Sequence, residues 1–318
     1  MAMETTNLTT LAKVAFSNES AAVELMTRLR WPNGVACPRC GGADPYKITP
    51  KAQPGRPARR GLFKCSACKK QFSVTTGSVF EASHVPLSKW LMAIHLMSAS
   101  KKGMSAHQLH RMLGTTYRAA WFMMHRLRLA MDSNMGVFAR LTGVVEVDET
   151  YIGAKNKRGT KRGRPGLGSH KTPVLALVQR GGRVRAFPME RVTSANLNAA
   201  IKTHMDPNAT MMTDDFAAYK STDHADHQTV NHSSGEYVRG SAHTNTAEGF
   251  FSLLKRGING SFHHVSKGHL HRYVTEFEFR YSNRLALGVN DSQRTEKIIL
   301  GAEGKRLTYK KRSSHRAA

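Results

Sequence analysis

The stretch Val144-Val145-Glu146-Val147-Asp148-Glu149-Thr150-Tyr151-Ile152-Gly153 decides the fold that we expect for this chain. Its apolar, β-branched start predicts a strand, and Asp148 stands where the apolar run ends. Strands with helices following them are typical of an α/β layer fold. The same chain half contains more such segments, with strands expected at 173–178, 183–189 and 210–213 and helices at 194–205, from about 246 and from about 267.

Three carboxylates in this half of the chain indicate a metal-dependent site. Asp214 follows the run at 210–213, 66 residues after Asp148, and Glu248 lies 34 residues further on, early in a helical segment. The carboxyl ends of adjacent parallel strands lie side by side, so the two Asp and one Glu on a crossing helix can converge. Such carboxylates repel one another unless divalent cations neutralise them, and a Mg²⁺ pair about 3.5–4 Å apart is the natural occupant. Lys255, two helical turns after Glu248, is then placed to touch a phosphate.

Each acid alone also has an ordinary structural explanation. Asp148 can cap a turn, Asp214 or its neighbour Asp215 can cap the short helix at 216–219, and Glu248 can pair with Lys255 or Arg256 on the surface. Their joint placement at strand ends, in a chain poor in acids, favours catalysis over these alternatives.

Four cysteines form two Cys-x-x-Cys pairs, Cys37 with Cys40 and Cys65 with Cys68, separated by 24 residues. Two such turns can aim four thiolates at one point, which gives a closed tetrahedral Zn²⁺ site. The alternatives are a redox pair, disfavoured because there are two pairs, and an iron–sulfur cluster. We expect one structural Zn²⁺ in a zinc ribbon.

A helical segment at 105–113, Gly114 and a second helix at 116–130 fit a helix-turn-helix. The second helix carries Arg118, Arg126 and Arg128, which we expect to contact DNA. Plain packing of a helical bundle is the alternative, because the apolar residues of both segments serve either purpose.

The charge balance favours a polyanionic partner. The 318 residues include 48 Lys and Arg against 22 Asp and Glu, a net charge of +26; nucleic acid is the commonest such partner and an anionic membrane surface the runner-up. No stretch approaches the roughly 18 to 20 apolar residues of a membrane span, and the first ten residues lack the pattern of a secretory signal. A basic, glycine-rich loop between the first two carboxylates is expected on the DNA backbone, with a solvated loop as the alternative; its cations include Lys157, Arg158, Lys161, Arg162 and Arg164.

Three segments resemble the DDE-type transposases of bacterial insertion sequences, in particular the ISXO-like group with an N-terminal zinc ribbon. They are Val-Asp148-Glu-Thr-Tyr-Ile-Gly, Thr-Asp214-Asp-Phe-Ala-Ala-Tyr, and His-Thr-Asn245-Thr-Ala-Glu248-Gly-Phe-Phe-Ser-Leu-Leu-Lys255-Arg-Gly. The resemblance implies a ribonuclease-H-like catalytic domain with two Mg²⁺ or Mn²⁺ ions held by Asp148, Asp214 and Glu248. In parts of this group an Asn is the third member, so Asn245 is the alternative to Glu248 or its neighbour in the site.

We therefore expect an α/β, ribonuclease-H-like transposase that binds terminal inverted repeats and catalyses DNA strand cleavage and strand transfer. A non-catalytic DNA-binding regulator and a nuclease that does not join strands are the alternatives. The expected partners are double-stranded DNA and further copies of the chain on that DNA, in the cytoplasm of a bacterium and associated with the nucleoid. The expected modules are an N-terminal helix (18–35), a zinc ribbon (36–80), a helical DNA-binding module (84–132), the catalytic domain (140–290) and a basic C-terminal tail (291–318).

Overall fold

A computed structural model of the chain describes residues 19–49, 61–132, 140–153, 171–230, 238, 240 and 242–309. The chain divides into two compact units. Unit 1 comprises residues 1–100, 104–132 and 290–318, and unit 2 comprises 101–103 and 133–289. No helix in the described ranges is long and apolar enough to cross a membrane.

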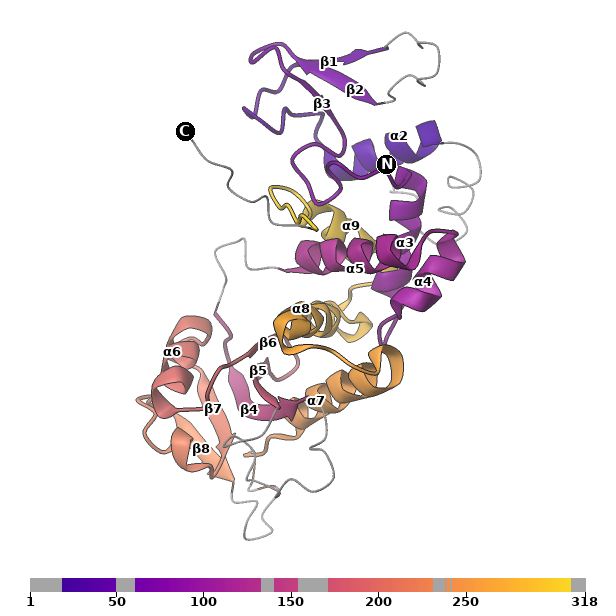
Figure 1. Cartoon of the computed structure of the whole chain (residues 1–318). Helices are drawn as coiled ribbons and strands as arrows, with labels where there is room; N and C mark the ends of the chain where they lie inside the picture. The colour runs from indigo at the N-terminus through magenta and orange to yellow at the C-terminus, as the bar shows by residue number, and fades with distance from the viewer. Residues whose placement is uncertain are drawn as a thin grey trace, which may run out of the picture. The chain divides into compact units, whose positions relative to one another are not determined.

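Unit 2 is built on a five-stranded mixed sheet (Figure 1). The spatial order of the strands is β6-β5-β4-β7-β8. Strand β5 pairs antiparallel with β4 and β6, whereas β7 pairs parallel with β4, and β8 pairs parallel with β7. Their bounds are β4 (Val144–Ile152), β5 (Thr172–Gln179), β6 (Val184–Pro188), β7 (Thr210–Asp214) and β8 (His227–Val230).

Helices cover both faces of this sheet. Alternation along a strand sends successive side chains to opposite faces, so Val145 and Val147 pack with helix α6 (Ser194–His204). The opposite face of β5 packs against α7 (Asn245–Gly257) and α8 (Lys267–Ser282) in a second core. Three layers with this strand order form the expected α/β, ribonuclease-H-like fold.

The described part of unit 1 contains a small antiparallel sheet and five helices. Strands β1 (Pro45–Ile48), β2 (Leu62–Cys65) and β3 (Gln71–Ser73) pair in chain order. The helices are α2 (Glu19–Arg30), α3 (Leu87–Ala99), α4 (Ala106–Leu113), α5 (Tyr117–Met131) and α9 (Asp291–Leu300).

The two helices expected at 105–130 are present, and local chemistry explains their ends. Ser105 and Thr116 cap α4 and α5 by accepting hydrogen bonds from backbone N–H groups of the first turn. Gly114 ends α4 at φ +57°, in the left-handed region that glycine occupies without steric cost.

The expected basic tail at 291–318 is wrong for its first ten residues, which form α9. Asn290 and Gln293 close a capping box at the start of this helix, and Ile298 and Ile299 are buried. The hydroxyl groups of Thr295 and Ser98 are 3.0 Å apart, joining α9 to α3. Apolar residues at helical spacing within this basic segment thus form a helix that belongs to unit 1. The expected N-terminal helix, zinc ribbon and helical module lie in the same compact unit as α9. Residues 310–318 lie outside the described part.

Candidate active site and thiolate cluster

Strand pairing places the two aspartates next to each other. Strands β4 and β7 run parallel with Glu146 opposite Met212 as the last paired residues. Two residues further on, Asp148 and Asp214 occupy equivalent positions on neighbouring strands, on the sheet face that α7 covers. Because the pairing ends before them, the strands separate at the point where the carboxylates stand.

Helix α7 brings Glu248 to the same place. A cavity of about 710 Å³ is lined by Asp148 and Glu149 from β4 and by Glu248 and Lys255 from α7. The spacing of seven residues along α7 puts Glu248 and Lys255 on one face of the helix, as the sequence predicted. Asp214 and Asn245 are not among the residues that line this cavity; Asp214 adjoins it through Asp148, and Asn245 is exposed at the first position of α7.

The electrostatics of Asp148 show how much negative charge gathers here. Burial, followed by the nearby carboxylates Glu149, Asp214 and Glu248, raises the pKa of Asp148 to about 7, although a hydrogen bond from the Glu149 backbone lowers it in part. A divalent cation would relieve this repulsion, and carboxylate oxygens are the ligands that Mg²⁺ prefers. The chemistry of the donor set therefore fits Mg²⁺ or Mn²⁺. As placed, however, the four cysteines are the only group of three or more potential ligands, within the described ranges, close enough to hold a single ion.

The structure supports only some of the ordinary structural explanations, caps and an ion pair, for the three acids. Asp214 accepts a hydrogen bond from the Phe216 backbone (3.1 Å), and Asp148 accepts one from the Glu149 backbone (2.7 Å), each through Oδ1. Across the described residues Glu248 forms no ion pair with Lys255. A local backbone contact thus occupies one oxygen of Asp148 and of Asp214, and the alternative of a surface ion pair for Glu248 is not met among the described residues.

Glu149 is a further acid in the cavity that the sequence analysis did not single out. It accepts a hydrogen bond from the Tyr219 hydroxyl (2.7 Å), and burial raises its pKa. Burial and the negative charge of Glu149 raise the pKa of Tyr219, so this phenol stays protonated and remains the donor. This hydrogen bond fixes the side-chain position of Glu149.

Glu146 is the buried acid that holds the start of α7. Its side chain has no exposed surface, and Oε2 accepts hydrogen bonds from the backbone N–H groups of Thr246 (2.7 Å) and Ala247 (2.9 Å). Oε1 accepts from the Thr246 hydroxyl (2.8 Å) and pairs with Arg180 (2.6 Å). A carboxylate at a helix N-terminus satisfies unpaired amides and complements the helix dipole. Glu146 thereby fixes the helix turn that carries Glu248.

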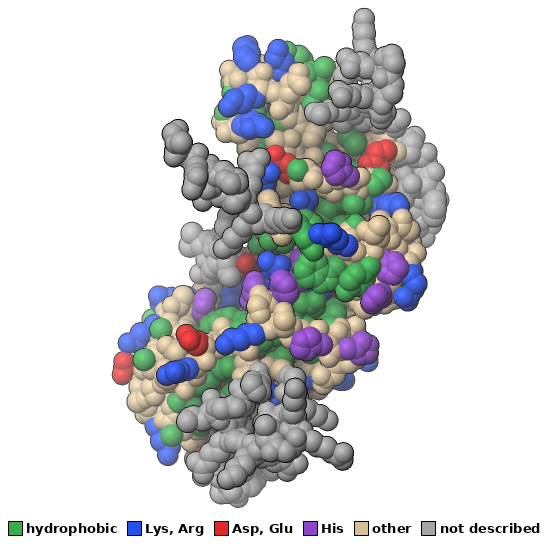
Figure 2. Space-filling model, in the orientation of Figure 1, with side chains coloured by type: hydrophobic (Ala, Val, Ile, Leu, Met, Phe, Trp, Pro, Cys, Tyr) green, Lys and Arg blue, Asp and Glu red, His purple; other side chains and the backbone are tan. Residues whose placement is uncertain are grey.

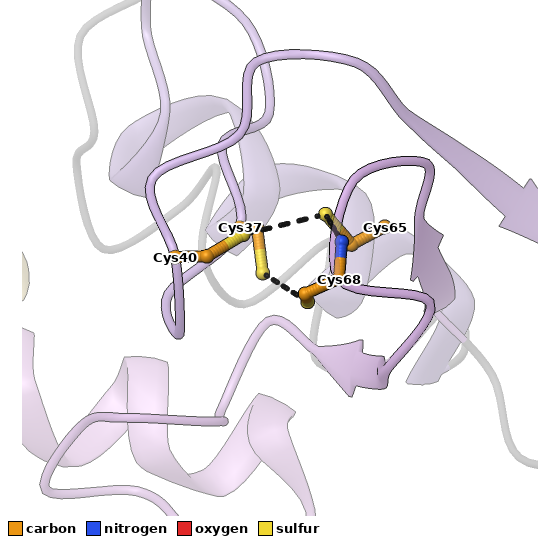
Figure 3. A group of neighbouring side chains, drawn as sticks. All are labelled: Cys37, Cys40, Cys65 and Cys68. Atoms are coloured by element: carbon orange, nitrogen blue, oxygen red, sulfur yellow. Dashed lines mark hydrogen bonds between the residues drawn. The ribbon is translucent and has the colours of Figure 1, made fainter.

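The four cysteine sulfurs point toward one another from two loops of unit 1 (Figure 3). Sγ of Cys37 lies 3.8 Å from Sγ of Cys68, and Sγ of Cys40 lies 3.6 Å from Sγ of Cys65. A tetrahedral Zn²⁺ with Zn–S bonds of about 2.3 Å separates its sulfurs by about 3.8 Å. All four sulfurs lie within 4.8 Å of one another, so the cluster is suited to hold a single Zn²⁺.

The two cysteine loops have the same backbone design. In the first, Cys37 N–H bonds Gly42 O (2.9 Å) and Gly41 N–H bonds Cys37 O (2.9 Å). In the second, Cys65 N–H bonds Lys70 O (3.1 Å) and Lys69 N–H bonds Cys65 O (3.0 Å). Both loops need a left-handed residue after the second cysteine, which Gly41 supplies at φ +75° and Lys69 at φ +59°. Lysine adopts this conformation only at a steric cost.

The expected DNA-contacting residues divide into three groups. Arg118 is exposed on α5, with its guanidinium 4.3 Å from the centre of the Tyr309 ring. Arg126 and Arg128 are only 7% and 1% exposed, and Arg126 donates to the Glu81 carbonyl (3.1 Å), so the structure contradicts their assignment to DNA. Helical spacing places Arg118 on the exposed side of α5, whereas it places Arg126 and Arg128 on sides that pack inside the helical bundle. The basic loop residues lie outside the described part and comprise Lys157, Arg158, Lys161, Arg162 and Arg164.

Lys and Arg side chains also gather on the surface of the zinc ribbon, at the top of the view in Figure 2. This face has the charge that a polyanion requires.

Comparison with known proteins follows the same division of the chain. Residues 140–282 match the family model of the ISXO2-like transposase domain, and residues 17–71 match that of the transposase zinc-ribbon domain. An uncharacterized protein in the transposable element ISH50 of Halobacterium salinarum is 32% identical over 280 residues, covering 83% of this chain and 91% of that protein.

Two solved structures share weaker similarity. A simian T-cell lymphotropic virus intasome bound to a PP2A regulatory subunit has a TM-score of 0.27 and 16% identity, covering 58% of this chain and 65% of that one. A pre-cleavage Mos1 transpososome has a TM-score of 0.25 and 14% identity, covering 68% and 79%. These scores are too low to bear on the fold, which is assigned from its strand order.

Proposed function

Since the chain belongs to the ISXO2-like transposases with an N-terminal zinc ribbon, we propose that it binds the terminal inverted repeats of an insertion sequence and catalyses DNA cleavage and strand transfer. The observation that carries this proposal is the cavity lined by Asp148 and Glu248, with Asp214 on the adjacent strand. Acids from two distant parts of the sequence line this cavity beside Lys255, a cation suited to a phosphate, and Asp214 lies next to it on the neighbouring strand.

In this proposal Asp148, Asp214 and Glu248 hold two Mg²⁺ or Mn²⁺ ions. When bound, the ions activate the attacking water or 3′-hydroxyl and stabilise the leaving 3′ oxygen. Lys255 binds a phosphate next to the reacting one, from the same face of α7 as Glu248. Glu248 is preferred to Asn245 as the third ligand because it is charged and lines the cavity, whereas Asn245 does not.

DNA binding is proposed for the basic surfaces of unit 1, with exposed Arg118 on the second helix of the helix-turn-helix segment. The thiolate cluster is proposed to hold one structural Zn²⁺, because its sulfur separations match a tetrahedral ion and four protein ligands leave no open position for catalysis. Cleavage of two element ends together would require at least a dimer on the DNA.

A cleavage and strand-transfer assay on DNA carrying the element's ends tests the proposal. Asp148→Asn and Asp214→Asn should each abolish Mg²⁺-dependent cutting, whereas Asp223→Asn, an exposed acid of the same unit paired with Lys202, should retain it. Unchanged cutting in the first two variants would refute the site. Cutting without joined products would indicate a nuclease, and binding without cutting a regulator.

Glu248→Gln and Asn245→Ala compare the two candidates for the third ligand. Loss of cutting in Glu248→Gln together with substantial retention in Asn245→Ala supports Glu248, and the reverse pattern reassigns the ligand to Asn245.

A further inference from the structure

A second cavity adjoins the acidic one and has the opposite charge. It measures about 310 Å³ and shares Lys255 and Asn259 with the first cavity as a common wall. Its polar lining adds Lys171, His263 and His264, and no carboxylate is among its lining residues. The acidic cavity, in contrast, is lined by three carboxylates.

Apolar core residues form part of the wall of this basic cavity. Ile258 and Val265 line it from below, and both belong to the core between the sheet and α8. Ile258 begins a π-helical turn (Ile258–Phe262) that follows α7. Phe262, at the end of this turn, packs against Tyr273 with ring centres 4.7 Å apart. Single π-helical turns occur preferentially at functional sites.

The histidines follow this turn in an unusual conformation. His263 adopts φ +60° although it is not glycine, and both His263 and His264 are exposed while Val265 beside them is buried. Non-glycine residues in this region persist where the surrounding packing enforces them, and they cluster at ligand sites. The core residues on either side thus hold two exposed imidazoles at the rim of the cavity.

We infer that the basic cavity binds the single nucleotide that adjoins the reacting phosphate on the same DNA strand, an inference that rests on the proposed function. A volume near the lower end of the roughly 300–1,000 Å³ typical of small-ligand sites admits one nucleotide and excludes a duplex. Lys171 and Lys255 supply charge for its phosphate. Tyr151 and Asn259 also line the cavity, and the Asn259 amide offers both a donor and an acceptor for the base edge.

Because the two cavities share a wall, a single DNA strand can occupy one cavity and then the other. A strand whose phosphate lies beside Asp148 and Glu248 passes Lys255 and Asn259 before reaching the second cavity. In this arrangement the metal ions bind the reacting phosphate, while the lysines neutralise the neighbouring phosphate and the imidazoles are placed to form hydrogen bonds with it.

Photo-cross-linking tests this inference with a local readout. The full-length Asp148→Asn chain is mixed with Mg²⁺ and a duplex carrying one element end, in which 5-iododeoxyuridine replaces each nucleotide near the cleaved bond in turn. Cross-links to Tyr151, His263 or His264 are expected from one position adjacent to that bond. Cross-links that form elsewhere on the chain but at none of these residues, from any position, would overturn the inference.

Variants of exposed residues supply the second measurement. Lys171→Ala combined with His264→Ala should lower the cross-link yield at Tyr151 at least tenfold. Lys202→Ala combined with His271→Ala removes the same side-chain types from unit 2 outside both cavities and should change the yield less than twofold. Equal yields in the two double variants would also overturn the inference. Cutting by Asp148→Asn in the same samples would instead refute the proposed function, so the two failures are distinguishable.

Discussion

Replacing Glu146 tests how the fold positions Glu248. Glu146→Ala removes the acceptor of two backbone amides at the start of α7 and leaves Arg180 without its buried carboxylate partner. Loss of a helix cap costs about 1 kcal/mol, and breaking a buried ion pair costs about 3–5 kcal/mol. Allowing for overlap between these terms, we expect about 4 kcal/mol for Glu146→Ala and about 2 kcal/mol for Glu146→Gln, which retains one acceptor oxygen.

Hydrogen exchange measured by mass spectrometry on peptides covering residues 245–254 reports this loss where it occurs. At about 1.4 kcal/mol per factor of ten, exchange in α7 should accelerate by up to about a thousandfold in Glu146→Ala and about thirtyfold in Glu146→Gln. Displacing Glu248 by about 1 Å should also lower the turnover number of strand cleavage by about a hundredfold. Binding of the element end should be unaffected, because that surface is proposed to lie in unit 1.

Glu278 provides the matched control within unit 2. It pairs with Arg185 (2.6 Å) and accepts from the Ala186 amide (3.1 Å), joining α8 to β6 away from the acidic cavity. Glu278→Gln should destabilise its own surroundings yet leave exchange in α7 and turnover within about twofold of the parent. If Glu146→Gln impairs turnover no more than Glu278→Gln, or leaves exchange at 245–254 unchanged, Glu146 does not position the catalytic helix.

Three further predictions concern the pH dependence, the metal and the backbone. The pKa of Asp148 rises from 3.8 to about 7 on folding, so without added Mg²⁺ the folded chain should lose up to about 4 kcal/mol between pH 4 and pH 7; Asp148→Asn should remove this loss, and thermal melts at pH 5 and pH 8 that fall equally in parent and variant would contradict it. Elemental analysis should find one zinc per chain and none after Cys37→Ser combined with Cys65→Ser, and a folded ribbon in zinc-free parent protein would exclude the structural metal. Lys69→Gly should relieve about 1 kcal/mol of strain and slow zinc release to a chelator, whereas Lys70→Gly should not; equal release rates would show that the second loop is unstrained.

The sequence predicted the elements that carry strong periodic patterns and the residues that carry recognisable motifs. The four strands with apolar runs are present, because buried strands need such runs on both sheet faces. Strand β8 was missed because His227-Gln-Thr-Val230 is short and polar, as befits the edge of a sheet. This segment forms a strand by pairing with β7, so no pattern within residues 227–230 themselves indicates it.

Burial explains the remaining differences between prediction and structure. Arg126 and Arg128 have the composition of a DNA-reading helix, but the bundle covers them, and only the packing of the neighbouring helices decides this. Glu146 sits inside an apolar run where an acid is unexpected, and that anomaly was the available sign of its function. Its partners at the start of α7 lie a hundred residues away, so the sequence alone gives no indication of them.

Because α9 belongs to unit 1, unit 1 is the later of the two units to be completely synthesised. Unit 1 is assembled from segments on both sides of unit 2, and domains fold as they leave the ribosome. All residues of unit 2 are therefore synthesised before the helix that finishes the unit with the thiolate cluster. A premature stop near residue 290 would keep every residue of unit 2 and its carboxylate cavity but would remove the helix that completes unit 1.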